Sequence, residues 1–120
     1  MSLAEIKNLI HQAELNSPGF PGGVKLIAVS KVQPNDRIQS VLEEGHRVFG
    51  ENRIQEAQSK WPTFKQQYQD VELHIIGPLQ TNKTRAAMEL ADSIHTLDRP
   101  KLATNMARLA QELGRCPELF

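Results

Sequence analysis

The sequence lacks the features that define several classes of protein. Its 120 residues include one cysteine, Cys116, which excludes an intramolecular disulfide and any zinc site built from several cysteines. Fourteen basic and fourteen acidic residues cancel to zero formal charge, so the composition does not favour nucleic-acid binding. No stretch approaches the roughly 20 apolar residues of a membrane span, and Glu5 and Lys7 interrupt the N-terminal stretch, unlike a signal peptide. We therefore expect a cytoplasmic protein without membrane or nucleic-acid partners.

Motifs that would identify common enzymes are also missing. Neither the G-x-G-x-x-G fingerprint of dinucleotide-binding folds nor the GK[ST] phosphate loop occurs. A serine-centred nucleophile elbow is absent as well. His11, His46, His74 and His95 show no spacing typical of metal ligands, and we predict no metal site.

The sequence does contain an alternation of strand-like and helix-like patterns. An amphipathic helix is predicted over residues 2–14, where Ser2 and Glu5 have the spacing of a capping box. Strands are predicted at 24–30, 47–50, 71–77 and 93–97, with a fifth beginning near 118. Helices are predicted at 35–44 and from 52 to an interruption at Pro62. Two more are predicted at 81–90, with Thr81 or Asn82 as N-cap, and at 100–113, with Gly114 as the stop. Strands separated by helices predict a parallel sheet in an α/β fold.

Two α/β architectures are compatible with this alternation: an open doubly wound sheet and a (β/α)8 barrel of the TIM type. A barrel needs roughly 200 to 250 residues, and this chain has about half of that. Its last residues, PELF, resemble a strand that has just begun. We expect residues 1–120 to be a single domain that forms about the first half of a barrel. Exposed sheet edges would then favour self-association or pairing with a missing second half.

Polar residues gather where the predicted strands end, which is the functional edge of both architectures. Lys31 follows the first strand, Asn52 follows the second, His74 lies in the third, and Asn82 and Lys83 open the next helix. Each has a plain structural interpretation: a solvated loop lysine, a helix N-cap, a hydrogen-bonded core histidine, and an ordinary helix start. The functional alternative is that Lys31 is an amine able to form a Schiff base with a carbonyl compound, and that amides near Asn82 and Lys83 hold an anion.

Four segments, taken in order, carry a more specific signal. AVSK at 28–31, FGENRIQE at 49–56, HIIGPLQTNK at 74–83 and IHTLD at 94–98 resemble successive motifs of the pyridoxal phosphate homeostasis protein family. The fold of that family is related to the N-terminal barrel of alanine racemase. The resemblance implies a (β/α)8 barrel that holds pyridoxal 5′-phosphate as an internal aldimine on the lysine that ends AVSK.

The resemblance assigns that role to Lys31, places Asn52 near the cofactor, and places His74, Asn82 and Lys83 around the same mouth. It also implies a non-catalytic protein that buffers or delivers the cofactor in vitamin B6 homeostasis. Arg53 departs from the family, which often has an aromatic residue there. The segment that holds the cofactor phosphate lies in the second half of the family's barrel. We therefore expect these 120 residues alone to bind the cofactor weakly or not at all, and a second chain that supplies the missing half to restore the site.

Two alternatives remain open at this point. A racemase-type enzyme would need a second base opposite the lysine, and the one tyrosine, Tyr68, lies in the polar stretch KQQYQD, which disfavours this function. A truncated or interaction fragment without cofactor is the other alternative, favoured by the abrupt PELF terminus.

Overall fold

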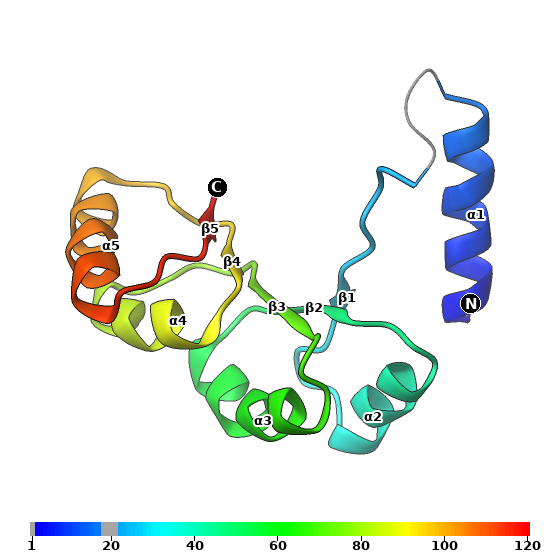
Figure 1. Cartoon of the computed structure of the whole chain (residues 1–120), viewed down its shortest axis with the longest axis horizontal. Helices are drawn as coiled ribbons and strands as arrows, with labels where there is room; N and C mark the ends of the chain where they lie inside the picture. The colour runs from blue at the N-terminus through cyan, green and yellow to red at the C-terminus, as the bar shows by residue number, and fades with distance from the viewer. Residues whose placement is uncertain (1, 18–21) are drawn as a thin grey trace.

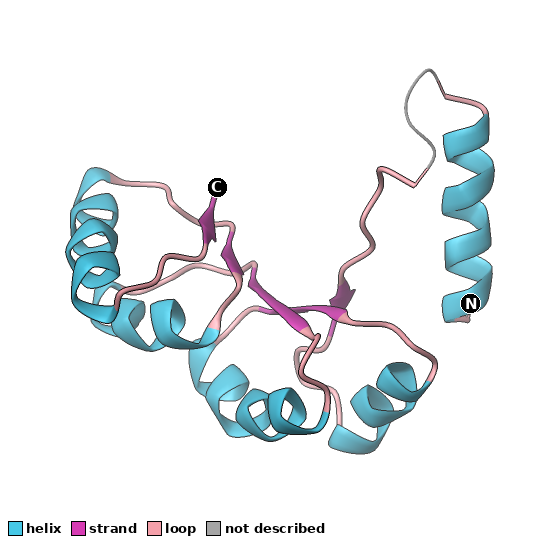
Figure 2. Cartoon of the chain, in the orientation of Figure 1, coloured by secondary structure: helices cyan, strands magenta, loops and turns pink. Residues whose placement is uncertain are grey.

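Five parallel strands form one sheet in the computed structural model, which describes residues 2–17 and 22–120. The strands are β1 (Ala28–Val29), β2 (Val48–Glu51), β3 (Glu72–Ile75), β4 (Ser93–Ile94) and β5 (Glu118–Leu119). The helices are α1 (Leu3–Leu15), α2 (Asn35–Glu43), α3 (Ile54–Gln67), the short 3-10 helix η1 (Thr81–Lys83), α4 (Thr84–Leu90) and α5 (Pro100–Leu113). The predicted alternation of strand and helix is confirmed (Figure 2).

The order of the strands separates the two architectures considered above. Neighbours in the sheet follow the order of the chain, β1-β2-β3-β4-β5, and every pair is parallel. Helices α2 to α5 lie along the same outer side of the sheet, which bends into an arc (Figure 1). A doubly wound fold reverses its strand order and carries helices on both faces. The chain is therefore a partial (β/α)8 barrel, and the expected fold class is confirmed.

The hydrophobic core lies between this arc and its outer helices. Alternate strand residues point to the core, as in β3, where Leu73 and Ile75 are buried against the helices. Helix α3 adds the largest side chain: the Trp61 ring is fully buried, with ring centroids 4.9 Å from Phe49 and 5.3 Å from Phe64. The inner face of the arc carries the other set of residues, which includes His74 and Gly50, paired across β2 and β3.

Several element boundaries differ from the predictions. Pro62 does not interrupt α3, which continues to Gln67. A proline inside a helix costs about 3 kcal/mol, but Pro62 is exposed while its neighbours Trp61 and Phe64 are buried. Burial of two such aromatic side chains stabilises the structure by several kcal/mol, so tertiary packing outweighs the local preference. The first strand is also shorter than predicted, because only Ala28 and Val29 pair with β2.

The predicted helix ends are confirmed where they depend on a specific cap. The Ser2 hydroxyl accepts a hydrogen bond from the Glu5 amide at 3.2 Å and starts α1. Gly114 has a φ of 69° and ends α5 in the left-handed region, where glycine has no Cβ clash. By contrast, neither Thr81 nor Asn82 caps α4. Both lie within η1, which Gln80 precedes, and the N-cap residue of α4 is Lys83.

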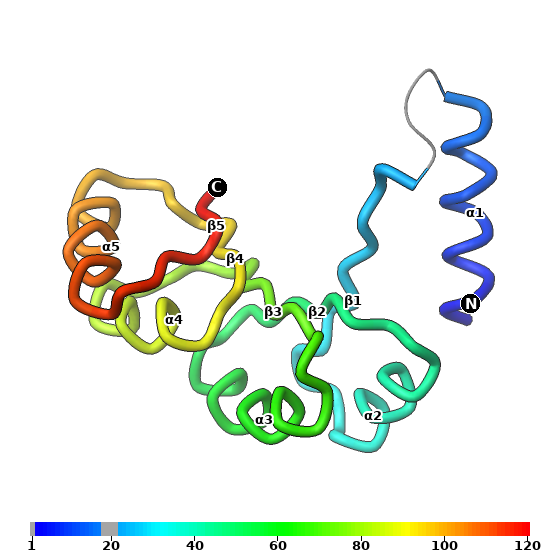
Figure 3. Tube along the Cα trace, in the orientation of Figure 1, coloured from blue at the N-terminus to red at the C-terminus, as the bar shows by residue number. Residues whose placement is uncertain are grey.

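Helix α1 lies apart from the outer layer of helices, beside the segment that leads into β1 (Figure 3). None of its described residues is buried, and Leu9 and Leu15 are 55% and 57% exposed. The Glu14 carboxylate accepts a hydrogen bond from the Val24 amide at 3.2 Å, which connects the helix to the body of the chain. Among the described residues, no helix combines the length and apolar character that crossing a membrane requires.

The buried His46 side chain predicts a pH dependence of stability. Its ring N–H donates to the Val48 carbonyl at 2.7 Å, and burial lowers the pKa of His46 below 6.5, with Lys7 and Arg47 adding repulsion. The unfolded chain then binds more protons than the folded chain below pH 6.5, so the free energy of unfolding falls as pH drops through that region. Urea unfolding should show a weaker decrease in His46→Gln, which keeps an N–H donor without the charge. An identical decrease in both proteins would contradict this assignment.

Candidate functional site

The carboxyl ends of β1 and β2 bring two of the predicted site residues to neighbouring positions. Val29 pairs with Gly50, and the Ser30 amide donates to the Gly50 carbonyl at 3.0 Å. Lys31 lies two residues beyond the end of β1, and Asn52 directly follows the end of β2. The Lys31 side chain is exposed, while Asn52 is partly buried. An amine and a carboxamide therefore share the edge at which barrel proteins place their functional groups.

Lys31 is carried by a tight and strained turn. The Gln33 amide donates to the Ser30 carbonyl at 3.2 Å, which closes a four-residue turn with Lys31 and Val32 at its centre. Val32 has a φ of 57°, in the left-handed region that a β-branched residue rarely adopts. Such a conformation costs of order 1–3 kcal/mol, and the side chain gains no burial in return because it is 82% exposed. Contacts elsewhere must hold the turn.

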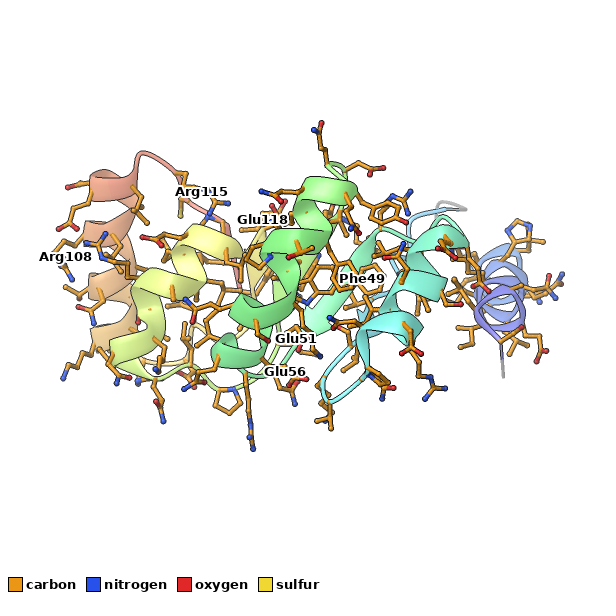
Figure 4. All side chains as sticks on the ribbon, turned by 90° about the horizontal axis from the view of Figure 1, so that it is seen from below. Phe49, Glu51, Glu56, Arg108, Arg115 and Glu118 are labelled. Carbon is orange, nitrogen blue, oxygen red and sulfur yellow. The ribbon has the colours of Figure 1, made fainter. Side chains whose placement is uncertain are left out.

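A buried polar cluster lies behind this turn, on the helical side of the sheet. Glu51 is fully buried, and its Oε1 accepts from the Ser30 hydroxyl at 2.5 Å and from Trp61 Nε1 at 3.1 Å. Its Oε2 has no hydrogen-bond partner in the part of the chain that the structure describes. Figure 4 shows Glu51 and Glu56 near the same end of α3. Glu51 follows the predicted strand 47–50 directly, but no local pattern indicates that its side chain is buried.

Two further side chains of α3 reach the turn, and sequence reasoning missed both. Lys60 Nζ donates to the carbonyls of Ser30 at 3.2 Å and Gln33 at 3.1 Å, and to Glu56 Oε1 at 2.7 Å. Glu56 Oε1 also accepts from the Val32 amide. The hydrogen bond from Lys60 holds the pKa of Glu56 below its ordinary value of 4.5. The spacing of four residues between Glu56 and Lys60 suits an ion pair along one helix, but it carries no information about contact with a distant turn.

A second feature of the edge is a cavity of about 590 Å³ next to Asn52. Its lining includes two predicted site residues, Asn52 and Lys83, and a second cationic side chain, Arg53; the remaining lining residues are Ile54, Gln55, Ile75, Pro78, Leu79 and Gln80. Lys31, His74 and Asn82 do not line this cavity. Asn82 is exposed on η1. The structure thus brings Asn52 and Lys83 together and leaves Asn82 on the surface.

The predicted capping role of Asn52 is wrong. Helix α3 begins at Ile54, and the residue at its N-cap is Arg53, which makes no side-chain cap bond. The local reason is the extended conformation of Arg53, with φ −116° and ψ 131°, which moves the helix start one residue along the chain. Asn52 is therefore free of a capping role and contributes to the cavity instead.

Close backbone contact fixes the position of Asn52, and this predicts an unequal effect of two alanine substitutions. A Cβ on Gly77 would lie 2.4 Å from the Asn52 carbonyl oxygen, whereas a Cβ on Gly50 would meet the tips of Ile27 and Ile76 side chains at 2.9 and 3.1 Å. We expect Gly77→Ala to lower the free energy of unfolding by about 2 kcal/mol or more, and Gly50→Ala by less, because backbone yields less readily than side chains. Paired urea titrations measure both; a larger loss in Gly50→Ala would contradict the prediction.

His74 lies on the inner face of the arc, within a chain of polar contacts. Its Nδ1 lies 2.8 Å from His95 Nε2, and its Nε2 lies 3.2 Å from Glu72 Oε2, which also accepts from Lys25 Nζ at 3.0 Å. The Lys25 and His74 hydrogen bonds lower the pKa of Glu72, and burial followed by repulsion from His74 lowers that of His95. These contacts match the structural interpretation of His74, and its place beside a cofactor stays a prediction. No group of three His, Cys, Asp or Glu side chains within 2–17 and 22–120 is arranged to hold a metal ion.

Curated proteins that share one name are similar to most of this chain. No protein-family model matches the chain. The chain is 38% identical over 107 residues to a pyridoxal phosphate homeostasis protein of Vibrio alginolyticus, covering 88% of this chain and 46% of the relative. It is 40% identical over 105 residues to the protein of that name in Pasteurella multocida, with 88% and 45% covered. The chain therefore spans about half the length of the curated relatives it matches.

A solved structure shows the same relationship. PipY of Synechococcus elongatus PCC7942, in its structure with PLP bound, is 44% identical to this chain and superposes with a TM-score of 0.78. The match covers 92% of this chain and 51% of PipY. This overlap is what an arc corresponding to half of a barrel would produce.

Proposed function

The chain belongs to the pyridoxal phosphate homeostasis protein family, of whose curated members it spans about half the length, and from this premise we propose that it supplies the lysine side of a pyridoxal 5′-phosphate site in vitamin B6 homeostasis. In this proposal the Lys31 amine attacks the cofactor aldehyde, a C=N bond replaces the C=O bond, and water leaves. The observation that carries the proposal is the exposed Lys31 amine on a held turn at the carboxyl edge of the sheet, where Asn52 follows the neighbouring strand.

The chemistry of the edge fits such a cofactor. When bound, the cofactor supplies an aldehyde and a phosphate. The Lys31 amine suits the aldehyde, and the Arg53 and Lys83 side chains at the neighbouring cavity give that part of the edge positive charge that attracts an anionic cofactor, although they are not the groups that hold its phosphate in this proposal. Asn52 offers both a donor and an acceptor between them. Asn82 and His74 are assigned supporting positions around the mouth, His74 from the inner face.

The proposed role is binding rather than catalysis. The matched relatives are named homeostasis proteins, and a racemase-type reaction needs a second base facing the lysine. Tyr68, at the C-cap of α3, accepts from Gln39 Nε2 at 2.8 Å and lies under Arg47 at 4.7 Å. Its carbonyl receives the Val71 amide just before β3, so Tyr68 belongs to the amino edge of the sheet, opposite Lys31.

The length of the chain sets the expected affinity. Backbone amides and helix N-termini that hold a phosphate supply much of the orientation of such a cofactor, and we propose that this part of the site belongs to the other half of the barrel. The 120 residues should accordingly bind the cofactor more weakly than PipY does. A second segment that completes the barrel should restore the affinity.

A spectrophotometric titration tests the proposed function. The chain and PipY are titrated in parallel with pyridoxal 5′-phosphate, and the absorbance change on formation of the Schiff base is followed. We expect a saturable change in both, with a higher dissociation constant for the chain. An absorbance change that rises without saturation, as it does with free lysine, would contradict a specific cofactor site. Racemisation of an added amino acid above the rate with free cofactor would favour the enzyme.

A further inference from the structure

The turn that carries Lys31 is held from one helix by a pair of charged side chains. Lys60 and Glu56, on α3, together bind backbone groups of Ser30, Val32 and Gln33. We propose that Lys60 and Glu56 are positioning residues for Lys31, which keep the strained turn in one conformation and so hold the Lys31 amine at the carboxyl edge. This inference rests on the proposed function of Lys31 and extends it to residues that no motif identified.

The bonding of Lys60 supports this role. A lysine ammonium has three N–H donors, and Lys60 directs them to two carbonyls that bracket Lys31 and to Glu56 Oε1. Its side chain is 11% exposed and also lies 3.9 Å from the buried carboxylate of Glu51. Attack on an aldehyde would require the Lys60 nitrogen to leave these three hydrogen bonds. The two lysines near the edge therefore differ in role: Lys60 is bound to the turn, and Lys31 is presented by it.

The conformation of Val32 explains why the turn needs such an anchor. With a φ of 57° and an exposed β-branched side chain, Val32 would favour a different backbone conformation if the turn were free. Glu56 accepts the Val32 amide, and Lys60 holds the carbonyls on both sides. Removing the Lys60 ammonium should release the turn, and Lys31 would then sample many positions. Misplacement of a reacting group by about 1 Å can lower a rate as much as a hundredfold.

The test compares Lys60→Met with Lys65→Met. Lys65 is a matched control on the same helix, since its Nζ donates to the Leu90 carbonyl and to Asp92 Oδ2, both at 2.9 Å, away from the turn. Two quantities are measured on the whole chain: hydrogen exchange of the Val32 and Gln33 amides, and the initial rate of borohydride-trapped pyridoxal 5′-phosphate incorporation at Lys31. We expect Lys60→Met to lose amide protection and to react at Lys31 at least about tenfold more slowly, while Lys65→Met keeps both.

Two further variants keep the test decisive. Lys60→Arg retains a cation with several donors and should restore much of the rate. Val32→Gly removes the strain of the turn, so adding it to Lys60→Met should also recover reactivity. If Lys60→Met fails to fold, Glu56→Ala removes the acceptor of the Val32 amide from a partly exposed position, and the same two measurements apply.

The outcomes separate this inference from the proposed function. Equal rates at Lys31 in Lys60→Met and the unmodified chain, or equal losses in Lys60→Met and Lys65→Met, would overturn the positioning role while Lys31 remained the reactive amine. Loss of amide protection without any change in rate would overturn it as well. Absence of trapped label at Lys31 in the unmodified chain would instead refute the proposed function, and the positioning role would fall with it.

Discussion

Lys31→Ala is expected to lower the incorporation of pyridoxal 5′-phosphate, trapped by borohydride, by at least about tenfold, because this change removes the amine that we propose forms the C=N bond. The measurement is the mass increase of the intact chain after reduction at limiting cofactor. Lys31 is exposed and lies outside the hydrophobic core, so the substitution should leave the unfolding transition unchanged. The loss can then be assigned to chemistry and not to folding.

Two controls accompany Lys31→Ala. Lys31→Arg keeps the positive charge but provides no amine of the same reactivity, and it should lose incorporation as fully as alanine. Lys101→Ala removes another exposed lysine, near the start of α5, and should react like the unmodified chain. Similar incorporation in Lys31→Ala and Lys101→Ala would show that the cofactor reacts with surface lysines in general.

Trp61→Ala should have the largest effect on stability, lowering the free energy of unfolding by about 3–5 kcal/mol. The Trp61 ring fills the space between Phe49 and Phe64, and its Nε1 donates to the buried Glu51. Alanine would leave both a cavity and a less satisfied buried carboxylate. Since small domains are stable by only about 5–15 kcal/mol in total, this loss would remove a large fraction of the stability.

Trp61→Phe separates the two contributions in that substitution. Phenylalanine keeps most of the packing but has no donor for Glu51, so its loss should be smaller than that of alanine. Urea unfolding followed by far-ultraviolet circular dichroism measures both variants. A loss below about 1 kcal/mol in Trp61→Ala, which is typical of surface substitutions, would contradict the central place of this ring in the core.

The sequence predicted the parts of the fold that depend on local pattern. The periodicity of apolar residues identified each helix, and Gly114 and Ser2 identified helix ends, because these signals arise within a few residues of the feature they predict. The continuation of α3 through Pro62 was not predictable in this way, since it depends on where Trp61 and Phe64 are buried. The same limit explains why strands such as Val24–Ser30 proved shorter: pairing partners, and not the strand itself, decide how much of it joins the sheet.

The candidate site, too, was predictable only where its signal is local. Lys31 and Asn52 were identified because they follow apolar strands directly, and parallel strands bring their carboxyl ends together. The hydrogen bonds of Lys60 and Glu56 to the turn were not predicted, because they join residues that are 24 to 30 positions apart in the sequence. The contact of His74 with His95 across β3 and β4 likewise depends on register, which no local pattern records.

One measurement tests the central claim, that Lys31 is the covalent anchor for the cofactor, most directly. The unmodified chain is incubated with limiting pyridoxal 5′-phosphate, reduced with borohydride, digested, and mapped by mass spectrometry. We predict that label accumulates first and predominantly on the peptide containing Lys31, while Lys60 stays unlabelled because its side chain is 11% exposed and would have to leave its hydrogen bonds to the turn. Label spread evenly over exposed lysines such as Lys7 and Lys101, with no preference for Lys31, would contradict it.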